Sequence, residues 1–137
     1  MFTILPHTAD VRLLVTAPNA TELFSIALGG MSQIQRKNFC AAAQEKCNIR
    51  LHIDIHSRDI TALLIDFLSE VLTLSHIHKA IFCNVHFLKF SETALTASIE
   101  GFNVNEFDED IKAVTYHEAD VIRNQDQHLE TMIVFDI

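Results

Sequence analysis

Glycine and proline are scarce in this sequence, with three and two residues among 137. Their scarcity excludes a low-complexity or linker-rich chain. Hydrophobic residues make up 49% of the chain and charged residues 20%, which is typical of a packed globular protein and not of a disordered one. At this length we expect one domain over residues 1–137, with a single hydrophobic core.

Cysteine is also scarce. Cys40, Cys47 and Cys83 are an odd number of cysteines and show no Cys-x-x-Cys spacing. We therefore expect neither a disulfide framework nor a zinc knuckle, and we expect a reduced, cytoplasmic protein. The N-terminus lacks the basic start and the long apolar stretch of a signal peptide. No window approaches about 18 uninterrupted apolar residues, so we expect no transmembrane helix and no membrane partner.

Positive charge is in deficit, because 10 lysines and arginines face 18 aspartates and glutamates, for a formal net charge of −8. An acidic surface disfavours direct nucleic-acid binding, which needs basic residues to neutralise phosphates. It is compatible with metal binding, with a basic protein partner, or simply with solubility. The motifs of phosphate-binding loops and of the serine nucleophile elbow are absent as well.

Hydrophobic periodicity predicts strands and helices in turn along the first half of the chain. Residues 11–17 are rich in β-branched and aliphatic types, and residues 49–55 alternate apolar and polar side chains, so both predict strands. Residues 19–22 have the Asn-to-Glu spacing of a capping box and predict the start of a helix. A broad apolar face predicts a second helix over about residues 58–74, capped by Ser57.

The second half of the chain returns to period two. It contains four strand candidates, at residues 80–90, 93–102, 111–122 and 128–137. The stretch RNQDQ between the last two predicts a hairpin turn. The order β-α-β-α-β-β-β-β predicts an α+β fold, in which a single mixed β-sheet has two main helices packed on one face.

Eight histidines raise the alternative of a zinc site. His52 and His56 are four residues apart, a spacing that suits a helix. On the predicted strand they lie about 13 Å apart, which is too far to share one zinc ion. The acidic run Glu106–Asp110 offers ligands for calcium, but it lacks the spacing of an EF-hand loop, and we interpret it as part of a solvated loop over residues 102–110.

Both ends of the chain carry carboxylates beside apolar strands. HTAD at 7–10 places Asp10 at the start of the first strand, and the closing IVFDI contains Asp136 and Ile137. If these strand ends meet, two aspartates and the terminal carboxylate form an anionic cluster that needs a cation or a basic partner. Oxygen-only ligation favours Ca²⁺ or Mg²⁺ over zinc. The alternative is that Asp10 caps a turn and Asp136 lies at a hydrated sheet edge.

Four stretches together resemble the archease family, in the family's order and from one end of the chain to the other. HTAD alone has little specificity, but its combination with KAVTYH and a terminal DI is specific. The stretches are HTAD at 7–10 with the following strand and ATELF, DITALLIDFLSEVLTL at 59–74, IKAVTYHEADV at 111–121, and the terminal FDI.

The resemblance implies a non-catalytic protein cofactor of the tRNA-splicing RNA ligase, which joins 2′,3′-cyclic-phosphate or 3′-phosphate RNA ends to 5′-hydroxyl ends. Archeases promote guanylylation of that ligase and its repeated turnover. The resemblance also implies a divalent metal, described as calcium, held by the residues matched to Asp10, Asp136 and Ile137. Lys112 and His117 are weaker candidates for the surface that faces the ligase.

Two features depart from the family pattern. Pro6 stands where relatives often have an acidic residue, and the acidic stretch before residue 111 is shorter than in relatives, where it often contains a basic-histidine pair. The residues themselves leave two other functions open. One is a general chaperone-like binding module with an exposed apolar face. The other is a metal-dependent hydrolase, although this sequence shows no recognisable pairing of a catalytic base with a nucleophile.

Overall fold

The computed structural model describes residues 1–5, 10–43 and 46–137, and its strands form two antiparallel sheets. The sheet that carries both ends of the chain, called the terminal sheet, has the order β1-β2-β8-β6, with β7 also paired to β8. It consists of β1 (Phe2–Leu5), β2 (Asp10–Ala17), β6 (Ala113–Thr115), β7 (Ile122–Arg123) and β8 (Leu129–Asp136). The three-stranded sheet has the order β3-β5-β4 and consists of β3 (Ile49–His56), β4 (Ala80–Phe90) and β5 (Ala94–Asn103).

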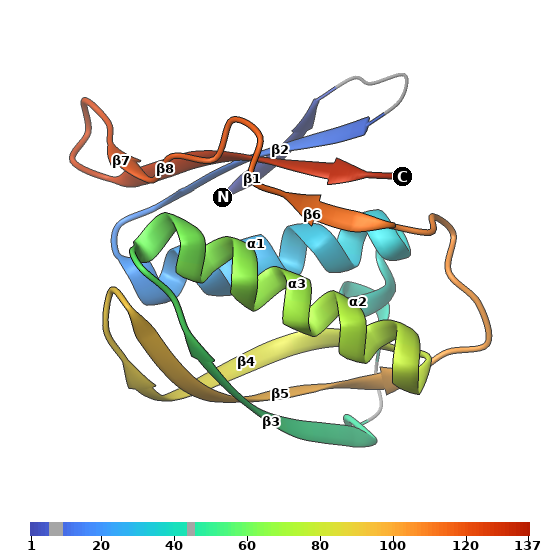
Figure 1. Cartoon of the computed structure of the whole chain (residues 1–137). Coiled ribbons are helices and arrows are strands. Elements are labelled where there is room, and N and C mark those ends of the chain that lie inside the picture. Colours follow the sequence, from blue (N-terminus) through green and yellow to red (C-terminus); the bar gives the residue numbers. More distant parts are fainter. Residues whose placement is uncertain (6–9, 44–45) are drawn as a thin grey trace.

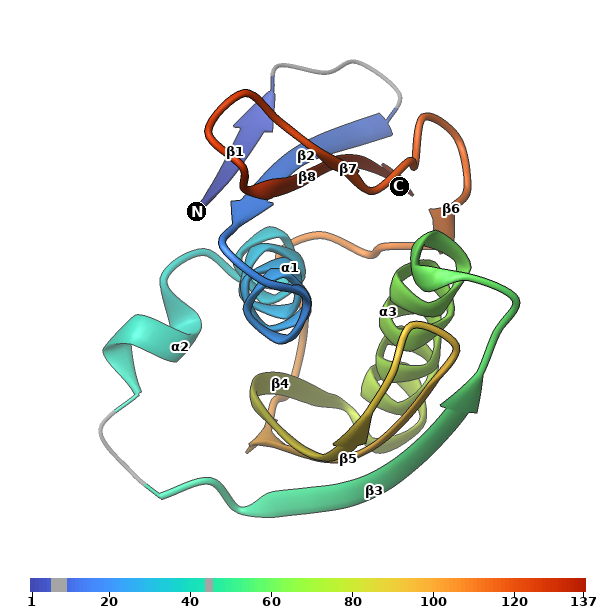
Figure 2. The same ribbon diagram turned by 90° about the vertical axis from the view of Figure 1, so that its left-hand side faces the viewer.

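The helices α1 (Ala20–Gln35) and α3 (Ile60–His78) lie between the two sheets (Figure 1). Figure 2 shows them side by side, with the terminal sheet on one side and the three-stranded sheet on the other. The short helix α2 (Phe39–Ala42) lies outside this layer. The predicted α+β class and its two main helices are confirmed, whereas the single mixed sheet is corrected to two antiparallel sheets.

The burial of α3 explains why two sheets are needed. The consecutive residues 62–65 of α3 are all buried, so its apolar surface extends around the helix and not along one stripe. A helix that is hydrophobic on most sides must be covered on most sides. One sheet covers one side only, and the second sheet covers the other. The same apolar composition makes α3 the one described helix that is long enough and apolar enough to cross a membrane. Half of its most apolar 18-residue stretch is nevertheless buried in the core.

The predicted cap of α1 is confirmed. Asn19 is the N-cap residue, and its Oδ1 accepts a hydrogen bond from the Glu22 backbone N–H at 3.0 Å. Glu22 Oε1 in turn accepts from Asn19 Nδ2 at 3.2 Å, so the glutamate contacts the cap side chain and not its backbone. Both interactions hold the start of α1 directly after β2.

The predicted cap of α3 is wrong. Asp59 is the N-cap residue, because its Oδ1 accepts from the Ala62 backbone N–H at 2.8 Å. Ser57 Oγ instead donates a hydrogen bond to Asp66 Oδ2 at 2.6 Å. The helix also continues past the predicted end to His78, and Lys79 then takes a left-handed φ of 48° that ends it.

The structure differs from the predicted elements in three further places. It adds β1 and α2, and it divides the predicted strand 111–122 into β6 and β7. Between these strands Glu118 has a left-handed φ of 61°, where an extended strand cannot continue. The hairpin turn at RNQDQ is confirmed, since the Asn124 N–H donates to the His128 carbonyl at 2.8 Å.

Cys40 of α2 and Cys83 of β4 form a disulfide, which corrects the expectation of unpaired cysteines. Their Cα atoms are 5.6 Å apart, although the residues are 43 positions apart in the sequence. The distance lies in the range that a disulfide requires. Spacing could not show this, because only the fold brings α2 beside β4.

The hydrophobic core lies between the helices and the inner faces of the two sheets. Phe24 of α1 packs against Phe67 of α3 with ring centroids 5.6 Å apart. Val11 and Phe135 are also fully or almost fully buried, with exposed fractions of 2% and 0%. These two residues follow Asp10 and precede Asp136, so packing in the core fixes the strand ends that carry the candidate site.

Candidate functional site

Asp10 and Asp136 lie opposite each other where β2 pairs with β8. The antiparallel register runs from Ala17 opposite Leu129 to Asp10 opposite Asp136. Directly opposed residues project from the same face, with Cβ atoms about 4.5–5.5 Å apart. Ile137 follows Asp136, so the fold brings both aspartates and the last residue of the sequence to one end of the terminal sheet (Figure 1). We call this end the carboxylate end.

The chemistry of the carboxylate end fits a hard divalent cation. Like charges directly opposite each other in a sheet repel. Among the described residues, neither Asp10 nor Asp136 forms an ion pair with a basic side chain. Carboxylate oxygens are the donors that Ca²⁺ and Mg²⁺ take. A bound cation of this kind therefore relieves a repulsion that the described side chains leave uncompensated.

The candidate set is small. In the part of the chain that the structure describes, no group of three or more His, Cys, Asp or Glu residues is arranged to hold a metal ion. The carboxylate end has two such side chains, and its third predicted donor is a terminal carboxylate on Ile137. His7 and Thr8 of the HTAD stretch, and Pro6 before it, lie outside the described residues.

The histidine alternative receives no support from the geometry. His52 is exposed on β3. His56 Nε2 lies 3.5 Å from Asp54 Oδ1, in a pair that involves no second histidine. The acidic run also contacts protein groups, since the Lys37 backbone N–H donates to Asp108 Oδ2 at 3.3 Å.

Lys112 and His117 flank β6 at its two ends. The Lys112 backbone N–H donates to the Asp136 carbonyl at 2.7 Å, and its side chain is exposed, so Lys112 lies at the carboxylate end. His117 lies past the other end of β6, where its N–H donates to Thr115 Oγ1 at 3.3 Å. Of the two weaker candidates, the fold brings only Lys112 to the carboxylate end.

An ion pair close to the carboxylate end escaped the sequence analysis. Arg12 of β2 forms a bidentate pair with Glu118, with Nε to Oε2 at 3.0 Å and Nη2 to Oε1 at 2.7 Å. The pair ties β2 to the segment that follows β6. Its members are 106 residues apart, so no local spacing could have revealed it. Arg12 is the described basic residue nearest to Asp10 in sequence, and its guanidinium binds the carboxylate of Glu118 and not that of Asp10.

Tyr116 takes part in a second network that the sequence did not reveal. Its hydroxyl donates to Asp66 Oδ1, while Ser57 Oγ donates to the other oxygen of the same carboxylate at 2.6 Å. The hydrogen bond to Asp66 is the main cause that raises the pKa of the Tyr116 phenol above its ordinary 10.0, and burial adds to it. The network joins the segment after β6 to the middle of α3.

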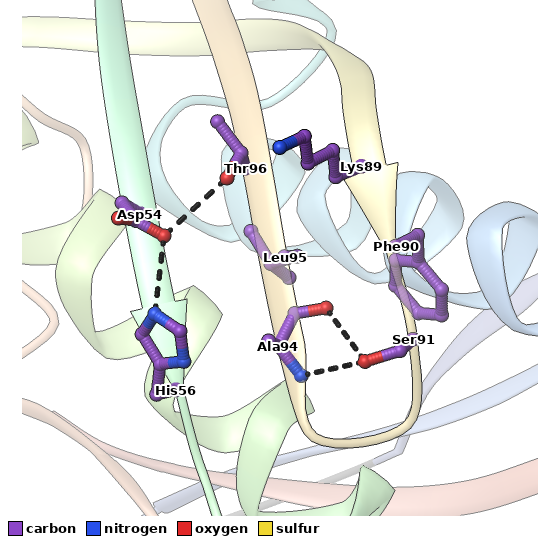
Figure 3. A pocket seen from close by; sticks show the side chains of 8 residues that line it. All are labelled: Asp54, His56, Lys89, Phe90, Ser91, Ala94, Leu95 and Thr96. Carbon is purple, nitrogen blue, oxygen red and sulfur yellow. Dashed lines mark hydrogen bonds and ion pairs between the residues drawn. The ribbon is translucent and has the colours of Figure 1, made fainter.

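A hollow of about 430 Å³ lies at the β4–β5 hairpin of the three-stranded sheet (Figure 3). Asp54 accepts a hydrogen bond from Thr96 Oγ1 at 3.3 Å and also pairs with His56 (Figure 3). Ser91 Oγ accepts from the Ala94 N–H at 3.1 Å and closes the hairpin turn. The Thr96–Asp54 contact joins β5 to β3, and the hollow shares no residue with the carboxylate end.

Comparisons with known proteins cover nearly the whole chain. The profile of the archease protein family (MTH1598/TM1083) matches residues 2–137. The chain is 28% identical over 144 residues to protein archease of Methanosarcina acetivorans, with 97% of this chain and 93% of that protein covered. It is 26% identical over 125 residues to protein archease of Methanosarcina mazei, with 85% and 83% covered.

Solved structures share the fold. The solution structure of Methanobacterium thermoautotrophicum protein 1598 superposes with a TM-score of 0.78 at 21% identity, covering 99% of this chain and 98% of that one. The crystal structure of a Thermotoga maritima archease, described as a "possible chaperone", gives a TM-score of 0.67 at 18% identity, covering 100% and 98%. At such identities the likeness establishes the fold, and the family profile establishes the family over the same residues. The chain belongs to the archease family.

Proposed function

We propose that this protein is a non-catalytic, cytoplasmic activator of the tRNA-splicing RNA ligase, and that it promotes guanylylation and repeated turnover of that ligase. The observation that carries the proposal is the register of β2 and β8, which places Asp10 opposite Asp136. Family membership supports the general role. The ligase, its guanylylation and the metal come from the family resemblance and are proposals for this chain.

The metal of the proposal is Ca²⁺, with Mg²⁺ as the alternative, held by Asp10, Asp136 and the carboxylate of Ile137. When bound, the cation supplies positive charge that neutralises the cluster. The chain itself supplies rigidity, because Val11 and Phe135 are buried beside the two aspartates. The hydrogen bond from the Lys112 N–H to the Asp136 carbonyl fixes the last strand further.

The proposed contact with the ligase is made through the carboxylate end. Lys112 is exposed there, whereas His117 lies beyond the other end of β6 and belongs at most to the margin of the contact. The net charge of −8 supports long-range attraction to a basic partner such as an RNA-binding enzyme. The same charge argues against strong direct binding of RNA by this chain.

The test measures covalent GMP incorporation into the ligase, with GTP and Mg²⁺ or Mn²⁺, in the presence and absence of this protein. We expect stimulation by the wild type and its loss in Asp10→Ala. Asp126→Ala is the matched control, because Asp126 is an exposed aspartate in the β7–β8 turn whose carboxylate makes no hydrogen bond or ion pair with the described residues. The absence of stimulation by the wild type, or equal stimulation by Asp10→Ala, contradicts the proposal.

A general chaperone-like binding module is the second candidate function. The words "possible chaperone" for the Thermotoga maritima relative favour it. Exposed apolar side chains offer contact sites, and Ile77 and Leu88 are 68% and 57% exposed. Client range separates the candidates: suppression of aggregation across unrelated proteins, without any effect on the ligase, supports the second and excludes the first.

A further inference from the structure

Two histidines lie level with each other on the outer face of the three-stranded sheet. His52 of β3 and His86 of β4 are both opposite Ser98 of the central strand β5. Both histidines are exposed, whereas their inward-facing neighbours Ile53 and Ala97 are buried. We propose that His52 and His86 together bind one divalent transition-metal ion of the group Ni²⁺, Cu²⁺ and Zn²⁺, which bridges β3 and β4 above Ser98.

The sheet register places both histidines on the same face. Directly opposed residues of antiparallel strands project from the same face of the sheet. Ser98 is opposed by His52 on one side and by His86 on the other. The register of β4 shifts twice, but His86 lies in the regular stretch 84–87 between the two shifts. The alignment of the two histidines across β5 therefore does not depend on an irregular part of the strand.

The spacing of the two strands suits a metal bridge. Neighbouring strands lie about 4.7–4.9 Å apart, so the Cα atoms of His52 and His86 are separated by about 9.5 Å. Two metal–nitrogen bonds of about 2.0–2.1 Å each take up about 4 Å of that distance. Each imidazole therefore has to reach inward by only about 3 Å. The pair differs in this respect from His52 and His56, which lie about 13 Å apart along one strand.

Ser98 leaves room for an ion between the two rings. Its side chain is short, so no bulky group stands between the strands that carry the histidines. Ser98 is nevertheless only 6% exposed, although it projects from the outer face. Neighbouring side chains on that face must therefore cover it, and the two directly opposite it are His52 and His86. Rings that lean over the same serine from both sides converge on the proposed position of the ion.

The charges beside the histidine row balance each other. In the adjacent row on one side, Arg50 of β3 pairs with Glu100 of β5 at 2.6 Å. In the adjacent row on the other side, Asp54 and Lys89 both lie opposite Thr96 (Figure 3). Each row carries one positive and one negative side chain, so these neighbours do not repel a cation.

Ligand chemistry separates this site from the carboxylate end. Imidazole nitrogens suit Ni²⁺, Cu²⁺ and Zn²⁺, whereas carboxylate oxygens suit Ca²⁺ and Mg²⁺. The described part of the chain offers no group of three His, Cys, Asp or Glu side chains for a metal ion. The proposed site therefore has two protein ligands, and water completes the coordination. It lies on the other sheet from the carboxylate end and does not depend on the proposed function.

Nuclear magnetic resonance of the histidine rings tests the site in the full chain. Spectra that correlate the ring nitrogens with the ring protons are recorded during a titration with Zn²⁺, with Ca²⁺ present in excess. Single His→Ala variants assign the signals. We expect the signals of His52 and His86 to shift together, with one Zn²⁺ per chain and before the signals of His56. The absence of a response, the response of one ring alone, or an equal response of His56 overturns the proposal.

Variants show whether the two histidines act as one chelate. We expect His52→Ala and His86→Ala each to weaken Zn²⁺ binding at least about tenfold, because either change removes the second point of attachment. The double variant loses little more than either single variant. His56→Ala is the matched control, since His56 is an exposed histidine of β3 on the same face, and it keeps the wild-type affinity.

The outcome is not confused by unfolding or by the ligase assay. All three histidines are exposed, so their replacement leaves the chain folded, which circular dichroism verifies. Losses below about tenfold in the single variants, or a double-variant loss equal to the product of the two single losses, contradict a shared ion. Because neither histidine belongs to the carboxylate end, this result and that of the ligase assay are independent.

Discussion

At the scale of single residues, the carboxylate end depends on two side chains that nothing but the fold places together. Asp10 and Asp136 are opposed in register, without a basic partner among the described residues. Their repulsion is unfavourable in the absence of a cation and becomes a source of affinity in its presence. The proposed metal site therefore predicts that cation binding and stability are linked at this pair.

We predict opposite effects of Asp10→Asn with and without calcium. Without metal, the variant gains about 0.2–1 kcal/mol in the free energy of unfolding, because one of two opposed like charges is removed. With Ca²⁺ at 100 times its Kd, the wild type gains about 2.7 kcal/mol and the variant does not. Thermal unfolding with Ca²⁺ and with a chelator measures both effects. Asp126→Asn is the control, and an equal calcium response of Asp10→Asn contradicts the assignment.

Tyr116→Phe removes the donor to Asp66, and we predict a loss of about 1 kcal/mol in the free energy of unfolding at pH 7. The pKa of Tyr116 is raised, so the folded state holds the phenol proton more tightly than the unfolded state. The contribution of the protonated Tyr116 phenol to the free energy of unfolding is complete below the pKa of about 10 in the unfolded state. It is lost as pH rises through the pKa in the folded state. Urea unfolding at pH 7 and above pH 10 measures the difference in the free energy of unfolding between Tyr116→Phe and the wild type. A difference that stays constant with pH contradicts the predicted role of the Tyr116 proton.

At the scale of elements, the contact between α1 and β2 is made close by a glycine. A Cβ atom on Gly30 would lie 2.5 Å from Leu13 Cδ2, and Leu13 is fully buried. A Cβ atom on Gly29 would meet nothing within 4 Å. Neither glycine has a positive φ, so space and not backbone conformation decides the outcome at both positions. Leu13 lies on the strand that begins with Asp10.

Alanine substitutions at these two adjacent positions of α1 therefore change the free energy of unfolding in opposite directions. We predict that Gly30→Ala lowers the free energy of unfolding by about 1–3 kcal/mol through overpacking against Leu13. Gly29→Ala raises it by up to about 1 kcal/mol, because alanine favours the helix and nothing opposes its Cβ. Urea unfolding of the two variants measures the pair. If the two substitutions change the free energy of unfolding equally, the packing argument is contradicted.

At the scale of the whole molecule, the disulfide is a long-range link across the fold. It joins residues 43 positions apart and attaches α2 to the three-stranded sheet. Such a link acts mainly by restricting the unfolded chain, with an effect that grows slowly with loop length. The rest of the molecule is held by a core packed between two sheets, so the fold does not depend on this bond.

We predict that reduction lowers the free energy of unfolding by about 2–4 kcal/mol without loss of the fold. Urea unfolding with and without a reducing agent measures the change. Cys83→Ser removes one sulfur of the disulfide, so the stability of this variant is expected to be independent of the reducing agent. Cys47→Ser keeps the dependence, since Cys40–Cys83 remains. A Cys83→Ser protein that still responds to reduction contradicts this account.

The sequence by itself determined the local structure and the family. The alternation in residues 49–55 and the spacing from Asn19 to Glu22 are local patterns, and β3 and the cap of α1 follow from them. The cap of α3 was misassigned because Ser57 and Asp59 are both good caps, and only the contact of Ser57 with Asp66 decides between them. The motifs of the archease family can likewise be recognised from the sequence alone.

Tertiary structure alone decided which strands share a sheet and which distant residues meet. Strand patterns show which face is buried but not the partner strand, so the expected single sheet became two around an α3 that is apolar on most sides. The Arg12–Glu118 pair and the disulfide have no sequence signal, because they join segments that are distant in the chain. Asp10 and Asp136 were candidates by composition and resemblance. Their direct opposition follows from the β2–β8 register, which burial of Val11 and Phe135 fixes.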